Sequence, residues 1–236
     1  MNTRNTGIIL KREFKNFFTS PTGYLVIGLF LIISGWFFFS SFFLYERADM
    51  RGFFSLLPII FAFTIPAVTM RLFSEEYRSG SFEIIGTMPV STLDIVVGKS
   101  LAALVFVIVM ILPTLSYAFF ISSIGELDWG PVIGGYIGSI LLAGAYVSIG
   151  VLSSSFTKNQ IVAFIISAAV CLFLSLVDKM LVLIPTGLGN VLQAVSSGYH
   201  FTNISRGILD SRDLLYFLSV IFLSLQAAWI FNRDHR

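Results

Sequence analysis

The chain has 236 residues, of which 56% are hydrophobic and 12% charged, and its formal net charge at pH 7 is +2. Because a soluble domain carries about 25% charged residues, this composition excludes an ordinary soluble globule, and the length suits a single domain. The one cysteine, Cys171, excludes an intrachain disulfide. The two histidines, His200 and His235, are too few and too far apart to indicate a metal site.

Charge-free apolar windows follow one another along the chain, and each approaches the length of about 20 residues that a helix needs to cross a bilayer. They predict six membrane-spanning helices at 22–45, 53–71, 100–123, 131–155, 159–178 and 213–231. We therefore expect an all-α integral membrane protein in which residues 1–236 form a single transmembrane domain. The first apolar stretch, Tyr24 to Leu44, lacks a small-residue cleavage site and is expected to remain as an anchor.

Residues 6–19, ahead of the first span, show an amphipathic helical pattern. Four apolar residues share one helical face and three basic residues share the other: Leu10, Phe14, Phe17 and Phe18 against Lys11, Arg12 and Lys15. A helix of this kind lies along the boundary between lipid headgroups and acyl chains. We therefore predict a helix in the cytoplasmic membrane interface, after which Pro21 and Gly23 turn the chain into the bilayer.

The basic residues divide unevenly between the two sides of the membrane. With the N-terminus in the cytoplasm, ten of the 15 lysines and arginines face the inside and five face the outside. An excess of Lys and Arg in cytoplasmic loops predicts this orientation. Because the number of spans is even, both termini are expected in the cytoplasm.

Residues 74–99 form the longest polar segment on the predicted inner face. Gly80 and Pro89 bracket a helix of about two turns. Ser91 and Asp94 form a capping box that marks the start of the next helix. A short helix held at the membrane surface between two spans suits contact with a soluble partner, although an ordinary capped loop explains the same pattern.

Residues 180–212 are predicted to lie outside without crossing the membrane. The part from Met180 to Ser205 carries no charge, but glycine, proline and polar residues interrupt it. Two short amphipathic helices that dip into the outer leaflet fit this pattern. Irregular backbone at that depth has to be buried by protein.

The fourth span carries small residues at Gly130, Gly134 and Gly138, in the GxxxG spacing. Small faces allow helices to approach closely. We expect packing within the chain here, with a dimer seam as the alternative.

Two sequence patterns resemble nucleotide-binding or catalytic sites but lack residues that such sites require. Gly98-Lys99-Ser100 resembles the end of a phosphate-binding loop, but Leu93 stands where that loop requires glycine. The acidic residues of the inner segment have no nucleophile or metal cluster in the sequence around them. The chain is therefore not expected to be an enzyme, and no cofactor is expected to bind to it.

The stretch from Ser74 to Lys99 resembles the cytoplasmic signature of ABC-2-type transporter permeases. The matching residues are Glu75-Glu76-x-Arg78, Gly80-Ser81-x-Glu83, Pro89-Val90-Ser91 and Gly98-Lys99, with Ser81 where threonine is common. Within that family the chain is most similar to the permeases of gliding-motility-type transporters. That similarity lies in Ser20-Pro21-x-Gly23-Tyr24, Ile65-Pro66-Ala67-x-Thr69-Met70-Arg71 and Tyr199-His200-Phe201, followed by residues 205–217.

The resemblance implies a permease of the bacterial cytoplasmic (inner) membrane, driven by two separate ABC ATPase subunits that bind ATP and Mg²⁺. It also implies a second copy of this chain or a close relative, lipid around the spans, sometimes an auxiliary subunit with an extracytoplasmic domain, and no nucleic acid. Residues of the inner segment would contact the ATPase: Glu75, Glu76, Arg78, Gly80, Phe82, Glu83, Ile85, Met88 and Pro89. Among them, Phe82, Ile85 and Met88 would form an apolar knob.

The dimer interface or transport pathway is expected near the second and fifth spans. Pro58 and Pro66 kink the second span, and Ser167 and Ala168 on the fifth are small enough for close approach. The sequence leaves open whether such a permease exports a substrate or transmits force to an extracytoplasmic subunit. A secondary, ion-coupled carrier is the alternative, disfavoured because we find no ionisable residue at mid-bilayer depth in any predicted span.

Overall fold

The structure is a computed structural model that describes residues 3–45, 49–82, 90–180, 192–208 and 210–234. Within these ranges all regular structure is helical. The elements are α1 (Thr3–Thr19), α2 (Pro21–Tyr45), α3 (Arg51–Thr69), α4 (Ser74–Ser79), α6 (Thr92–Ile111), the 3-10 helix η1 (Leu112–Thr114), α7 (Leu115–Ile124), α8 (Trp129–Ser155), α9 (Gln160–Met180), α11 (Ser197–Ser205) and α12 (Ser211–Asp234).

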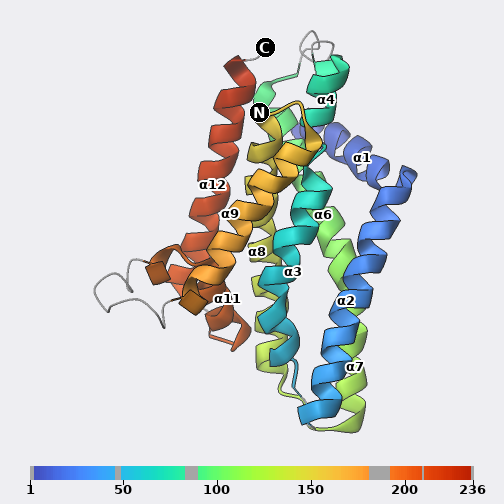
Figure 1. Cartoon of the computed structure of the whole chain (residues 1–236), viewed down its shortest axis with the longest axis vertical. Helices are drawn as coiled ribbons and strands as arrows, with labels where there is room; N and C mark the ends of the chain where they lie inside the picture. The colour runs from blue at the N-terminus through green and yellow to red at the C-terminus, as the bar shows by residue number, and fades with distance from the viewer. Residues whose placement is uncertain (1–2, 46–48, 83–89, 181–191, 209, 235–236) are drawn as a thin grey trace.

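Six helical segments of the described chain are long and apolar enough to cross a membrane, which confirms the six predicted spans. They are Pro21–Ser40, Arg51–Ser79, Thr92–Ile124, Trp129–Ser155, Gln160–Met180 and Ser211–Arg233, and they form an elongated bundle (Figure 1). The third span differs from a single straight helix because η1 separates α6 from α7 around Pro113. A proline inside a helix removes one backbone donor and crowds the preceding turn.

Both ends of the chain lie at the same end of the bundle as α4, and α2 and α7 end at the opposite end (Figure 1). We call these the inner end and the outer end, after the predicted orientation. A shared position of the termini agrees with an even number of crossings. The side of the membrane on which the inner end lies stays a prediction.

Helix α1 confirms the predicted amphipathic helix but uses its apolar stripe for packing within the protein. Phe17 is buried, and its ring lies 4.8 Å from that of Phe106 on α6. A Cβ added at Gly98 of α6 would meet the side chain of Ile9 at 2.9 Å, so the two helices are in close contact. The stripe is therefore covered by α6, and the location of α1 in the membrane interface stays a prediction.

The small residues of α8 pack against other helices of the same chain. A Cβ at Gly134 would lie 2.4 Å from the backbone oxygen of Ile204, and one at Gly138 would lie 3.2 Å from the ring of Phe201. Both of these neighbours belong to α11. The expectation of packing within the chain is confirmed for these two glycines, and α11 occupies the face that the alternative dimer seam needs.

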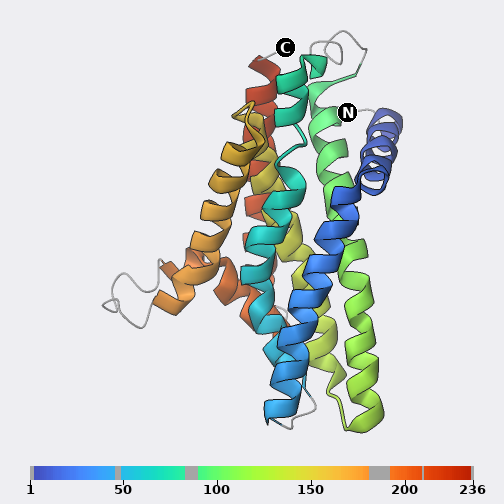
Figure 2. The same ribbon diagram turned by 45° about the vertical axis from the view of Figure 1, so that its right-hand side comes forward.

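Helix α11 is one of the two short outer helices that the sequence predicts. It has nine residues, too few to cross a bilayer, and it packs against α8, α9 and α3. Figure 2 shows that it lies near the end of α9, well before the outer ends of α2 and α7. The other expected helix falls mainly on residues 181–191, which lie outside the described residues.

Replacing Gly134 with alanine is expected to destabilise the protein by about 1–3 kcal/mol, because the new methyl group would overlap backbone atoms that cannot rotate away. The matched control is Gly28→Ala in α2, where an added Cβ would meet nothing within 4 Å. That control is expected to be neutral or to gain up to about 1 kcal/mol from helix propensity. Thermal unfolding in detergent distinguishes the two, and equal melting temperatures would contradict the contact.

Candidate functional site

The segment predicted to bind a partner begins with α4 at the inner end. Two acidic residues, Glu75 and Glu76, stand in its first turn, where they complement the positive end of the helix dipole. Gly80 ends the helix with a φ of 71°, a left-handed conformation that favours glycine over residues with a Cβ. Gly80 therefore ends α4, whereas the helix predicted between Gly80 and Pro89 falls mainly on residues 83–89, which lie outside the described residues.

A buried lysine joins α4 to two other helices. The Lys99 side chain, on α6, is 2% exposed, and its Nζ atom lies 2.7 Å from Glu76 Oε1 and 3.9 Å from Glu13 Oε1 of α1. Lys99 also donates a hydrogen bond to the carbonyl of Leu72, and its ammonium lies 4.8 Å from the centre of the Phe73 ring. A buried charge needs partners of this kind, because its desolvation is otherwise uncompensated.

A polar cavity of about 470 Å³ opens beside this cluster, between α1 and the end of α3 with α4. Three basic and three acidic residues line it, together with mostly polar neighbours: Arg12, Arg71, Lys99, Glu13, Glu75, Glu76, Asn16, Phe17, Thr19, Ser20, Leu72, Ser79 and Ser81. This mixed lining suits a polar protein surface better than an apolar ligand.

A second polar contact, which we call the inner joint, attaches α4 to α12. The Tyr77 hydroxyl donates a hydrogen bond to Asn232 Oδ1 at 2.5 Å, and Asn232 Nδ2 donates to Ser155 Oγ of α8 at 2.8 Å. The Phe82 ring packs 4.7 Å from the Tyr77 ring. Helix α4 is thus bonded directly to α6 and α12, whose bonding residues also bind α1 and α8.

The structure places the predicted coupling residues in different environments. Glu75 and Arg78 are exposed, whereas Glu76 is bound in the ion pair with Lys99. Phe82 is 5% exposed and packs inside the chain, which differs from the expected exposed knob. The remaining members lie outside the described residues: Glu83, Ile85, Met88 and Pro89. Contact with an ATPase stays a prediction for the whole set.

The residues proposed for a dimer interface or pathway are all buried within the chain. Pro58 and Pro66 belong to the buried face of α3, which packs on α9. Ser167 and Ala168 of α9 are 1% and 6% exposed. In this conformation these side chains line a contact inside one subunit, and their role between subunits stays a prediction.

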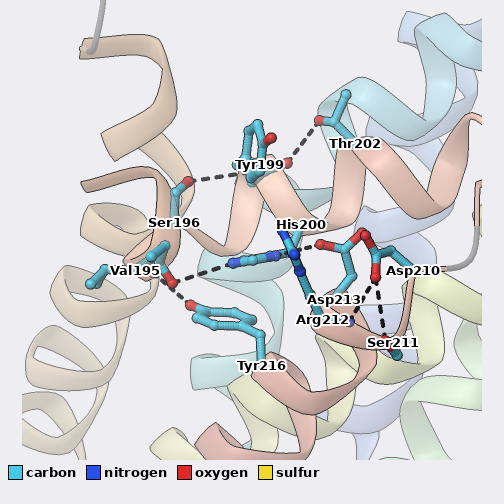
Figure 3. A network of polar contacts seen from close by, with 12 residues as sticks. Val195, Ser196, Tyr199, His200, Thr202, Asp210, Ser211, Arg212, Asp213 and Tyr216 are labelled. Atoms are coloured by element: carbon cyan, nitrogen blue, oxygen red, sulfur yellow. Dashed lines mark hydrogen bonds and ion pairs between the residues drawn. The ribbon is translucent and has the colours of Figure 1, made fainter. Parts of the chain in front are cut away.

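A polar cluster near the outer end was not expected from the sequence, where His200 entered only as part of a family motif (Figure 3). His200 Nδ1 lies 2.5 Å from Asp213 Oδ1, and the rings of His200 and Tyr216 are stacked with their centres 4.2 Å apart. The Tyr216 hydroxyl donates to the Val195 carbonyl at 2.6 Å. The sequence did contain one indication of this cluster. Asp213 and Tyr216 are three residues apart, which places both on one face of α12.

A third group of polar residues lies inside the bundle. The Tyr146 hydroxyl of α8 is 2.6 Å from Ser175 Oγ of α9 and 2.7 Å from Ser197 Oγ of α11, and all three residues are buried. The local sequence did not indicate this group, because its three members come from separate helices far apart in the chain.

The family described as ABC-2 family transporter protein matches residues 8–219. The chain belongs to this family. No curated protein matches the chain. Family membership makes this protein a permease, the membrane component of an ABC transporter, and implies that it associates with ABC ATPases. The match confirms the family resemblance seen in the sequence, while the similarity to gliding-motility-type permeases stays a prediction.

Replacing Lys99 with methionine is expected to destabilise the permease by about 3–5 kcal/mol, because it leaves the carboxylates of Glu76 and Glu13 buried without their cation. A Lys99→Met/Glu76→Gln double variant is expected to recover part of this loss. Lys158, an exposed lysine also at the inner end, provides the control variant Lys158→Met. Thermal unfolding in detergent measures the effect, and similar losses in both methionine variants would contradict the role of the ion pair.

Proposed function

We propose that this permease couples ATP hydrolysis, performed by a separate ATPase, to substrate export or to force transmission toward an extracytoplasmic subunit. The observation that carries the proposal is the attachment of α4 through the Lys99–Glu76 ion pair and the Tyr77–Asn232 hydrogen bond. A surface helix that receives force has to be fixed to the parts that it moves. Helix α4 is fixed directly to α6 and α12 through these contacts, and through Lys99 and Asn232 indirectly to α1 and α8.

The exposed side of α4 offers the docking surface. Glu75 and Arg78 are exposed and carry opposite charges, so they suit a partner with complementary charges. The polar cavity beside α4 extends this surface toward α1. Charge complementarity of this kind sets the register and the specificity of an interface.

The proposed assembly contains two permease chains, or one with a close relative, and two ATPases in the inner membrane with both permease termini in the cytoplasm. Family membership supports the ATPases. The side chain of Lys99, in the motif that resembles a phosphate-binding loop, is engaged by Glu76, which supports a nucleotide site on another chain.

An ion-coupled carrier is the second candidate function. The observation in its favour is the buried His200–Asp213 pair, since ionisable residues within membrane proteins often mark ion or proton pathways. The Oδ2 atom of Asp213 is buried and has no hydrogen-bond partner among the described residues. Family membership favours the ATP-driven function over this one.

Reversing both exposed charges of α4, in a Glu75→Lys/Arg78→Glu variant, is expected to lower ATPase binding about tenfold or more, because like charges would then face each other across the interface. The ATPase that co-purifies with the permease in mild detergent is quantified, together with its rate of ATP hydrolysis. The matched control is Lys158→Glu, which changes an exposed charge away from α4. Unchanged binding in the double variant would contradict docking at α4, and absence of any ATPase from the wild-type preparation would favour the carrier.

Single cysteines at opposite ends of the bundle are expected to react from opposite sides of the membrane. In a Cys171→Ala background, Ser79→Cys reports the inner end and Arg206→Cys reports the outer end, since both positions are exposed. Labelling with an impermeant maleimide in cells is expected at position 206 only, and at position 79 after the membrane is opened. Labelling of both from the same side would overturn the topology.

A further inference from the structure

Helix α12 is bonded at its two ends to α4, at the inner end of the bundle, and to α11, in its outer half (Figure 1). Asn232, near its inner end, bonds to Tyr77 of α4, and Asp213, in its first turn, bonds to His200 of α11. The 19 residue-to-residue steps from Asp213 to Asn232 rise about 28 Å at 1.5 Å per residue. This length is close to the hydrocarbon thickness of a bilayer, about 30 Å.

The inner joint is a buried amide whose groups are all engaged. Asn232 is 0% exposed and accepts the hydroxyl hydrogen of Tyr77 at Oδ1. Its Nδ2 group donates to Ser155 Oγ and to the Ala228 carbonyl, at 2.8 and 2.6 Å. A buried amide that uses its oxygen and both hydrogens is held in one orientation. This end of α12 is therefore bonded to both α4 and α8.

The outer joint has two contacts on successive turns of α12. Asp213 holds the His200 imidazole at 2.5 Å, and the Tyr216 ring stacks on it while its hydroxyl binds the carbonyl of Val195, just before α11 (Figure 3). His200 Nε2 lies 3.3 Å from the carbonyl of Ala194. Helix α12 is thus bonded both to α11 and to Val195, just before α11.

Between the joints, α12 meets lipid on one side and α8 on the other. Its outward face exposes Leu215, Leu218, Phe222 and Leu223, whose apolar contacts with lipid do not fix a position along the helix axis. On the inward side, Ile221 lies against Gly144 of α8, where an added Cβ would be 3.0 Å from its Cδ1 atom. Directional polar bonds are therefore concentrated at the ends, which suits a rigid element that moves as a whole.

We propose that α12 is a rigid link that transmits displacement of α4 at the inner end to α11 in the outer half of the bundle. The inference rests on the proposed function, because a docked ATPase supplies the displacement of α4. Helix α11 packs against Gly134 and Gly138 of α8 and bonds to Tyr146 through Ser197. Its movement therefore opens the outer half of the bundle, where α3, α8 and α9 converge on it.

The proposal is tested by hydrogen–deuterium exchange of the full-length permease in lipid nanodiscs, without any ATPase. Tyr77→Phe removes one hydroxyl from the inner joint and keeps the ring. Loss of one buried hydrogen bond is expected to raise the exchange rate of amides 198–205 in α11 about fivefold, although they lie at the other end of α12. In the reverse direction, Asp213→Asn is expected to raise exchange in residues 74–79 of α4, because coupling between two sites is reciprocal.

The matched control is Ser153→Ala, which removes a buried hydroxyl near the inner end of α8 that bonds only within its own helix. It is expected to leave α11 unchanged. The link is overturned if Tyr77→Phe affects only α4 and its neighbours, or if Ser153→Ala raises exchange in α11 equally. ATPase co-purification is measured separately, so the link can fail while the proposed function stands, and loss of ATPase binding leaves the exchange result intact.

Discussion

The inner end of this permease is organised around one buried cation, the Lys99 ammonium group. Removing an ammonium ion from water costs several kcal/mol unless anionic and hydrogen-bonding partners replace the water. Those partners come from three separate segments, with Glu76 on α4, Glu13 on α1 and the Leu72 carbonyl between α3 and α4. Separation of these segments would leave charges buried without a partner. This requirement holds α4 beside α6 and next to the cavity, and the Tyr77–Asn232 hydrogen bond attaches α4 to α12.

The membrane topology could be predicted from the sequence because it depends on a property of continuous stretches. A charge-free window of spanning length has few alternatives to a transmembrane helix, and the structure contains all six. Caps are equally local: Ser91 accepts a hydrogen bond from the Asp94 amide at 3.1 Å, as the capping box predicts. The apolar stripe of α1 was visible for the same reason. Its partner was not, because amphipathicity does not distinguish a lipid surface from the apolar side of α6.

The polar joints were beyond prediction because they depend on residues that are far apart in the chain. Tyr77 and Asn232 are separated by 155 positions, and Tyr146 and Ser197 by 51. The local sequence around each residue does not identify a bonding partner at this distance along the chain. Phe82 shows a prediction that was wrong: an exposed side chain was expected, and the structure buries it. A large apolar side chain in a polar segment suggested an exposed contact for a partner, yet the rings of Tyr77 and Phe73 were available to bury it.

The separation of the two joints on α12 has a consequence for the host membrane. At about 28 Å apart along the helix, they match the hydrocarbon thickness, so each lies close to a border where polar groups are tolerated. A thicker bilayer would draw one joint among the acyl chains, and a thinner one would expose apolar residues of α12 to water. Each ångström of mismatch costs a fraction of a kcal/mol. The acyl-chain length of the surrounding lipids is therefore a physical variable that affects the contacts of α12 with α4 and α11.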